Sequence, residues 1–171
     1  MRFRFLFLGW LLLPFSLGAA DLRPVIQREA AACAAAWQRN DYEGIVAYLP
    51  PRLVQRAGGK PAAIRELKEQ FAEARQLGVE AMDARPGTPS TPRPLGPWLV
   101  SLVPLTAVLH GPHVDLTQAT HALALSADKG RHWSFVLLYQ VSQARFEKWF
   151  PELAGKITVP TDPAPSLEVV L

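Results

Sequence analysis

The stretch 127-ADKGRHWSFVLLYQV-141 decides more about the fold than any other part of the chain. Its first four residues predict a β-hairpin turn, because Gly130 can adopt a left-handed backbone conformation beside Asp128 and Lys129. Residues 131–141 then predict a strand. Large apolar side chains share one face of that strand at a period of two: Trp133, Phe135, Leu137, Tyr139 and Val141.

The residues before this hairpin predict further strands. Residues 114–126 alternate in part between apolar and polar side chains and supply the other arm of the hairpin. Residues 98–109 are rich in Leu and Val, and Pro104 within them indicates an edge or a bulge. Residues 79–85 predict one more strand. Residues 86–97 contain five prolines and two glycines and predict an exposed loop.

Helices are predicted ahead of the strands. Residues 23–39 form a helix with one apolar stripe: Leu22, Ile26, Ala30, Cys33 and Trp37. Residues 61–77 form another, with Ile64, Leu67, Phe71 and Ala74 as its stripe and Gly78 as the residue that ends it. Helices followed by an antiparallel meander predict an α+β fold.

A short helix is predicted between these two, over residues 42–49. Asn40 is expected to cap it, with Glu43 three residues later as in a capping box. The prolines at 50 and 51 end it. Residues 52–56 are expected to be a short extended link.

Residues 1–20 have the pattern of a secretory signal peptide. Arg2 and Arg4 are followed by an apolar run from 5 to 17 and by small residues at 18–20. The run is shorter than the about 20 residues that a spanning helix needs, so cleavage is favoured over an uncleaved anchor. No transmembrane anchor would remain after cleavage. We therefore expect an exported protein, periplasmic or secreted.

The expected domain organisation follows from this segment. Residues 1–20 are the signal peptide, 21–155 a single α+β domain, and 156–171 a Pro-rich C-terminal tail. A short helix over 143–150 is expected to pack back on the domain. The part of the tail from Pro160 onward is expected to be loose.

The charge and the cysteine content of the chain argue against some classes of function. The chain has 18 Lys and Arg against 15 Asp and Glu, and loss of Arg2 and Arg4 leaves 16 against 15. No basic cluster remains, so we expect no nucleic-acid partner. Cys33 is the single cysteine. Its place on an apolar stripe favours a small buried hydrophobe over a redox or intermolecular role.

The order of these elements resembles the nuclear transport factor 2-like superfamily (NTF2-like, SnoaL-like, cystatin-like α+β). The resemblance rests on a long helix ending in Trp37, residues 40–42, prolines 50 and 51, residues 58–60, Gly78 and the hairpin 128–135. It implies N-terminal helices packed in a strongly curved antiparallel sheet, a cone with an apolar pocket at its wide end. Members include isomerases, dehydratases, polyketide cyclases and transport factors, so the fold does not select one function.

Candidate site residues are few. Asp115 and His121 share one face of a predicted strand, and Tyr139 lies on the next, so these three are the catalytic candidates of an isomerase-like site. Their spacing matches no family catalytic motif, and no catalytic residue is carried over from the resemblance. The aromatic residues Trp133, Phe135 and Tyr139 are candidates to line a ligand pocket, with ordinary core packing as the alternative.

No metal or cofactor is expected. A metal site could be drawn from His110, His113, Asp115 and His121, but two histidines in a hairpin turn are usually exposed turn residues. The favoured function is a non-catalytic module that binds a small apolar ligand or an envelope protein. The alternatives are a small isomerase, dehydratase or cyclase acting on an apolar substrate, and a structural homodimer.

Overall fold

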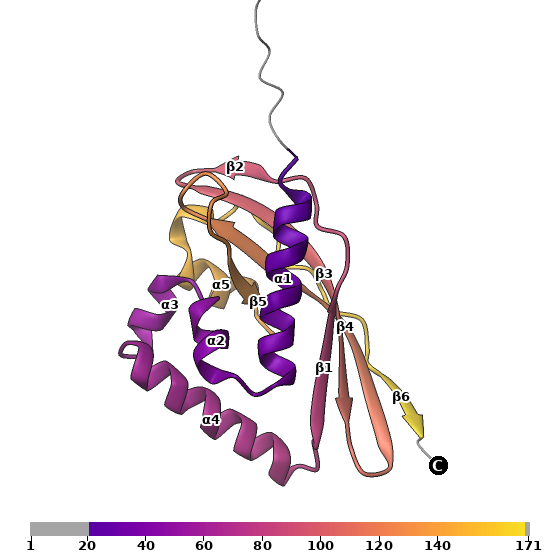
Figure 1. Ribbon diagram of the computed structural model, residues 1–171. Coiled ribbons are helices and arrows are strands. Elements are labelled where there is room, and N and C mark those ends of the chain that lie inside the picture. The colour runs from indigo at the N-terminus through magenta and orange to yellow at the C-terminus, as the bar shows by residue number, and fades with distance from the viewer. Residues whose placement is uncertain (1–20, 170–171) are drawn as a thin grey trace, which may run out of the picture.

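N-terminal helices pack against a strongly curled antiparallel half-barrel sheet in the computed structural model, which describes residues 21–169 (Figure 1). This arrangement confirms the predicted α+β class. The helices that come first are α1 (Arg23–Gln38), α2 (Tyr42–Ala47), α3 (Pro51–Arg56) and α4 (Lys60–Gln76). The expected signal peptide lies outside the described residues.

The sheet has the order β1-β3-β4-β5, with β2 paired to β3 and β6 paired to β4. Its strands are β1 (Ala81–Pro86), β2 (Arg93–Leu95), β3 (Trp98–His110), β4 (Val114–Ser126), β5 (Ser134–Leu137) and β6 (Ser166–Val169). The β3–β4 pairing runs without a bulge from Leu99 opposite Ser126 to His110 opposite Asp115. Residues that face each other in this register therefore share a face of the sheet.

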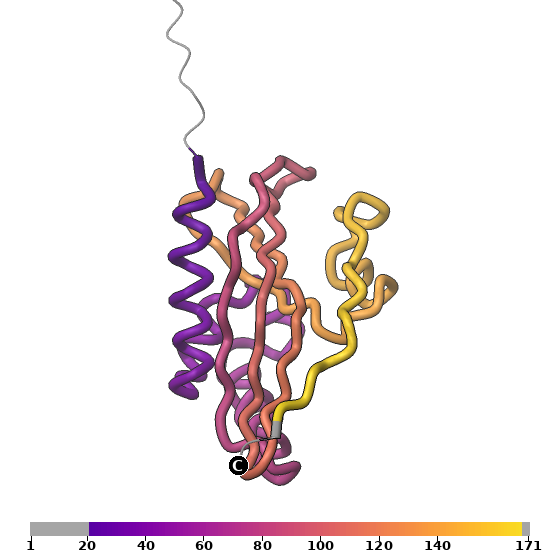
Figure 2. Tube along the Cα trace, turned by 90° about the vertical axis from the view of Figure 1, so that its right-hand side faces the viewer, coloured from indigo at the N-terminus to yellow at the C-terminus, as the bar shows by residue number. Residues whose placement is uncertain are grey.

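The two faces of the sheet are covered by different helices. Figure 2 shows α1 on one side and α5 (Gln143–Trp149) with the C-terminal segment on the other. We call these sides the α1 face, which carries Val103 and Ala122, and the α5 face, which carries Val100 and Leu123. The short helix η1 (Pro151–Leu153) completes the layer over the α5 face.

Two predictions about the helices are wrong. The expected extended link is the helix α3, because Pro51 occupies its first turn, where a missing N–H costs nothing. The cap of α2 is Asp41, whose Oδ1 accepts from the Gly44 amide at 2.9 Å. Asn40 takes a left-handed conformation instead, with φ of 53°. The predicted end of α4 is confirmed at Gly78, with φ of 91° and an amide donating to Arg75 O.

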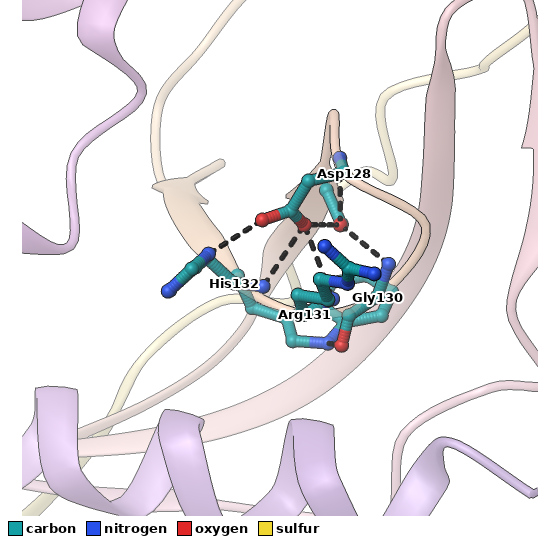
Figure 3. A network of polar contacts seen from close by, with 6 residues as sticks. Asp128, Gly130, Arg131 and His132 are labelled. Atoms are coloured by element: carbon teal, nitrogen blue, oxygen red, sulfur yellow. Dashed lines mark hydrogen bonds and ion pairs between the residues drawn. The ribbon is translucent and has the colours of Figure 1, made fainter.

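The strand predicted over residues 131–141 is shorter than expected at both ends: β5 ends at Leu137, and Gln140 has a left-handed φ of 54°. The carboxylate of Asp128 accepts from the Arg131 and His132 amides at 3.1 and 2.9 Å and also pairs with His132 Nδ1 (Figure 3). These contacts, those from His132 first, hold the pKa of Asp128 well below its ordinary value. They keep residues 128–132 in a loop, so the ladder starts only at Ser134.

The apolar face predicted for that strand is only partly buried. Trp133 and Phe135 are buried, but Leu137 and Tyr139 are 41% and 38% exposed. The residues between them are buried on the α5 face, with Val136 at 3% and Leu138 at 1%. The α5 face of this segment is therefore buried at both of these positions, whereas its other face is buried only as far as Phe135.

Two segments expected to be irregular contain strands. Within the Pro-rich loop 86–97, β2 pairs with the start of β3, and Ser101 Oγ donates to Ser90 O at 2.7 Å. At the C-terminus, β6 pairs antiparallel with the first residues of β4, so the expectation of a loose tail is wrong there. Both strands form because a long neighbouring strand offers free backbone groups at its edge.

Candidate functional site

An apolar cavity of about 100 Å³ lies between α1, α2 and the α1 face of the sheet. The helices contribute Ala30, Cys33, Ala34, Trp37, Ile45, Tyr48 and Leu49. The strands and their ends contribute Met82, Ala84, Pro86, Val103, Leu105, Ala107, Ala122, Phe135 and Leu137. No lining residue carries a formal charge at neutral pH.

Small side chains that face each other produce this cavity. From α1, Ala30 and Ala34 point to a part of the sheet that also presents small residues, Ala84, Ala107 and Ala122. The alanine side chains are too short to fill the space between the helix α1 and the sheet. Apolar cavities bind small apolar molecules, and a space of about 100 Å³ can take at most a small ring or a short alkyl chain.

One polar pair lies at the cavity. The hydroxyl of Tyr48, whose ring lines the space, donates to Glu29 Oε2 at 3.5 Å. Burial raises the pKa of Tyr48, and the negative charge of Glu29 raises it further. Tyr48 therefore stays a neutral hydrogen-bond donor, and its ring is 6.0 Å from that of Phe135, centroid to centroid.

Cys33 also lines the cavity. Burial raises the pKa of its thiol to about 12, although a hydrogen bond with Trp37 opposes the shift. A thiol of this kind stays protonated at neutral pH and is a poor nucleophile. Cys33 therefore acts here as a small apolar side chain, in line with the expectation from its place on the apolar stripe.

The structure does not bring the three catalytic candidates together. Asp115 and His121 are six residues apart on β4, which corresponds to roughly 20 Å. Asp115 contacts His110 Nδ1 at 3.0 Å near one end of the sheet. His121 pairs across the ladder with Pro104. None of the three candidates, Tyr139 included, is among the residues that line the cavity.

The three aromatic residues predicted to line a ligand pocket also lie in different places. Phe135 lines the apolar cavity. Trp133 is buried beside it, but its Nε1 donates to Gly130 O at 3.2 Å and it serves as core. Tyr139 lines a different, polar groove between the end of β5 and the segment 159–165, where its hydroxyl accepts from Gln140 Nε2.

Sequence reasoning missed Glu29, Tyr48 and the alanines as site residues. The signal that could have revealed the cavity is the run 30-AAACAAA-36, because a buried helix face built from alanine is too small to fill the space above a sheet. Tyr48 had no such signal, since its approach to Glu29 depends on how α2 folds back on α1.

Neither a metal site nor a membrane span is found within residues 21–169. No three His, Cys, Asp or Glu side chains there are grouped to hold a metal ion. No helix in this part of the chain is long and apolar enough to cross a bilayer. The chain matches no family model, no curated protein and no solved structure. Its helices on a curled half-barrel sheet are compatible with an NTF2-like fold.

Proposed function

We propose that this protein is an exported NTF2-like module that binds a small apolar molecule in the cavity beneath α1, without catalysis of its own. The observation that carries the proposal is the cavity itself. Protein interiors are normally packed without voids of this size. A space of about 100 Å³ leaves the apolar side chains around it in incomplete contact, and an apolar ligand that fills it restores those contacts.

The lining defines the class of ligand. Apolar side chains surround almost all of the space, and Tyr48 and Cys33 supply the polar atoms. A ligand with a compact apolar body and at most one polar group fits this surface. A charged ligand does not, because no lining side chain would compensate its lost hydration. The signal-peptide pattern of residues 1–20 supports a ligand met outside the cytoplasm.

Thermal unfolding with benzene or indole as the probe tests this proposal. We expect either probe to raise the unfolding temperature of the purified protein, because it binds the folded state alone. Ala34→Leu fills the cavity and should abolish the shift. Ala32→Leu, on the exposed side of α1, is the matched control and should retain it. If Ala34→Leu does not fold, Ala107→Val fills the space by a smaller step.

The single cysteine provides an independent readout. Alkylation of Cys33 is expected to be slow because its thiol stays protonated, and it should become slower still when the probe occupies the cavity that the thiol lines. The proposal is wrong if neither probe shifts unfolding or protects Cys33, or if Ala34→Leu and Ala32→Leu respond alike.

A second candidate is an isomerase, dehydratase or cyclase that uses the same cavity. The specific observation in its favour is the Tyr48–Glu29 pair, which sets a phenol donor beside a carboxylate that can accept a proton. Under this alternative, Tyr48→Phe and Glu29→Gln would each abolish turnover of a carbonyl substrate while probe binding persists. Equal turnover by both variants and the unchanged protein would exclude these roles.

A further inference from the structure

A polar groove lies on the α5 side of the sheet, beside a part of the β4 edge that pairs with none of the described strands. β5 pairs with Ala122–Leu125 and β6 with Val114–Thr117, so residues 118–121 lie between the two pairings. Figure 2 shows the C-terminal segment descending from the α5 layer to the edge of β4. The space between this segment and the end of β5 is about 510 Å³, within the roughly 300–1,000 Å³ of small-molecule sites.

Glutamine side chains hold the segment 159–165, which forms one wall of the groove. Gln118 is 4% exposed, and its Nε2 donates to Pro163 O at 3.0 Å. Gln143 Oε1 accepts from the Val159 amide at 2.9 Å. Prolines at 160, 163 and 165 restrict the backbone of the same wall. The groove is therefore formed before a ligand arrives, which lowers the ordering cost of binding.

The turn in the opposite wall has an uncommon backbone conformation. The Val141 amide donates to Leu138 O at 3.0 Å, and Gln140 within this turn has a φ of 54°. Non-glycine residues in this region are uncommon and cluster at ligand sites. The turn ends the strand and leaves Tyr139 38% exposed at the groove.

The groove offers both hydrogen-bond donors and acceptors. The Tyr139 hydroxyl accepts from Gln140 Nε2 at 3.0 Å, and Ser142 Oγ accepts from the Arg145 amide at 3.2 Å, so each hydroxyl has its own hydrogen to donate. Asp162 also lines the groove, and its Oδ1 is buried without a hydrogen-bond partner among the described residues. Such an oxygen is unfavourable without a donor, and the soft terminal torsion of an aspartate can turn it toward the groove.

The charge of the lining selects against ions. Asp162 is the only charged residue that lines the groove. An anion would meet this carboxylate with no cation to compensate it. An ammonium group only donates, so it would leave the hydroxyls of Tyr139 and Ser142 without an acceptor. A hydroxyl both donates and accepts, so a ligand rich in hydroxyls matches all of these groups.

We propose that this groove binds an uncharged saccharide, with sugar hydroxyls on Asp162 and Ser142 and one face of the sugar ring against Tyr139. The apolar C–H face of a sugar suits an exposed tyrosine, whose body is apolar and whose tip is polar. This site is separate from the cavity beneath α1, because no residue lines both. A sugar in the groove therefore leaves the cavity free for an apolar molecule.

NMR titration with glucose, galactose and mannose tests the proposal, with the amide shifts of residues 138–143 as the readout. We expect at least one of these sugars to give saturable shifts with a dissociation constant of about 1 mM, as the usual affinity per atom gives for a ligand of this size. The uronic-acid analogue of that sugar should bind about tenfold more weakly or worse, because its carboxylate meets Asp162. The amine analogue should bind within about threefold of the neutral sugar, because an exposed ion pair adds little.

Substitutions in the groove give a second test. Asp162→Ala should weaken binding of that sugar about tenfold or more, because it removes a charged acceptor. Tyr139→Phe keeps the ring and removes the hydroxyl, and should weaken binding about three- to tenfold. Glu168→Ala removes an exposed carboxylate that does not line the groove. It is the matched control and should bind like the unchanged protein.

The amide signals of the β3–β4 ladder verify folding in each variant. If Asp162→Ala fails to fold, Asp162→Asn takes its place, with a smaller loss of affinity expected. The proposal is overturned if none of the three neutral sugars shifts residues 138–143, or if only an amine analogue does. It is also overturned if the Asp162 variant binds as tightly as Glu168→Ala.

Discussion

The two faces of one sheet show opposite packing. On the α5 face, Phe146, Phe150 and Leu153 are fully buried, and the two phenyl rings are 5.5 Å apart. On the α1 face, Ala30 and Ala34 meet a sheet surface that is itself rich in alanine, and a cavity remains. The same sheet therefore supports a filled core on one side and a hollow on the other, and the size of the helix residues makes the difference.

This contrast separates stability from binding. Large side chains in full contact stabilise the α5 face by dispersion and by removal of apolar area from water. The α1 face gives up part of that stabilisation for a space that a ligand can occupy. Substitutions that change side-chain volume should thus have opposite consequences on the two faces.

The largest expected effect is on the α5 face. Phe146→Ala should lower the free energy of unfolding by about 3–5 kcal/mol, because the ring is fully buried and its neighbours cannot close the space. Urea titration followed by circular dichroism measures the change. A loss below about 1 kcal/mol would mean that the α5 face is not the tightly packed one.

The next largest difference should come from substitutions that add side-chain volume to one face or the other. Val136→Leu on the α5 face should destabilise the protein by about 1–3 kcal/mol through overpacking. Ala107→Val, which points into the cavity, should be neutral or stabilise it by about 0.5–1 kcal/mol. Unfolding free energies of both variants give the comparison, and equal losses would contradict it.

The smallest effect concerns a polar contact at the rim of the α5 face. Glu152 accepts from Arg52 Nη1 at 2.8 Å and from Trp98 Nε1 at 2.9 Å. Burial alone would raise the pKa of Glu152, but these hydrogen bonds outweigh it and the pKa is lowered. We expect Glu152→Gln to cost about 1 kcal/mol at pH 7.

The sign of its pH dependence follows from that lowered pKa. The unfolded chain binds a proton at Glu152 more readily than the folded protein, so the contribution is full above the unfolded pKa. It is lost as the pH falls through the folded value. The free energies of unfolding of Glu152→Gln and of the unchanged protein should therefore converge in acid. A constant difference between them down to pH 3 would refute this role.

Local patterns predicted the elements whose signals lie within the element itself. Strand β4 has the predicted bounds, because its alternation and its flanking turns are adjacent in sequence. The end of α4 at Gly78 was predictable for the same reason. The prediction for β5 was too long, because the side chain of Asp128 captures backbone amides that the ladder would otherwise use.

The residues of the candidate site were harder to predict from the sequence than the helices and strands. Phe135 was predicted as a pocket residue and lines the cavity, whereas Trp133 and Tyr139 do not. Whether an aromatic residue fills a core or borders a hollow depends on the volume of residues distant in sequence. The pairing of Tyr48 with Glu29, and that of His110 with Asp83, likewise join segments far apart in the chain.

The sequence by itself determined the α+β class, the two long helices and the β3–β4–β5 meander, since periodicity and turn residues act over a few neighbours. Only the tertiary structure decided where the cavity lies, which side chains border it, and that β6 docks on the edge of β4. Those outcomes depend on which faces meet across the sheet. The alanine run 30–36 indicates one wall of the cavity, but the volumes and charges that distant segments add to it cannot be read from a single stretch of the chain.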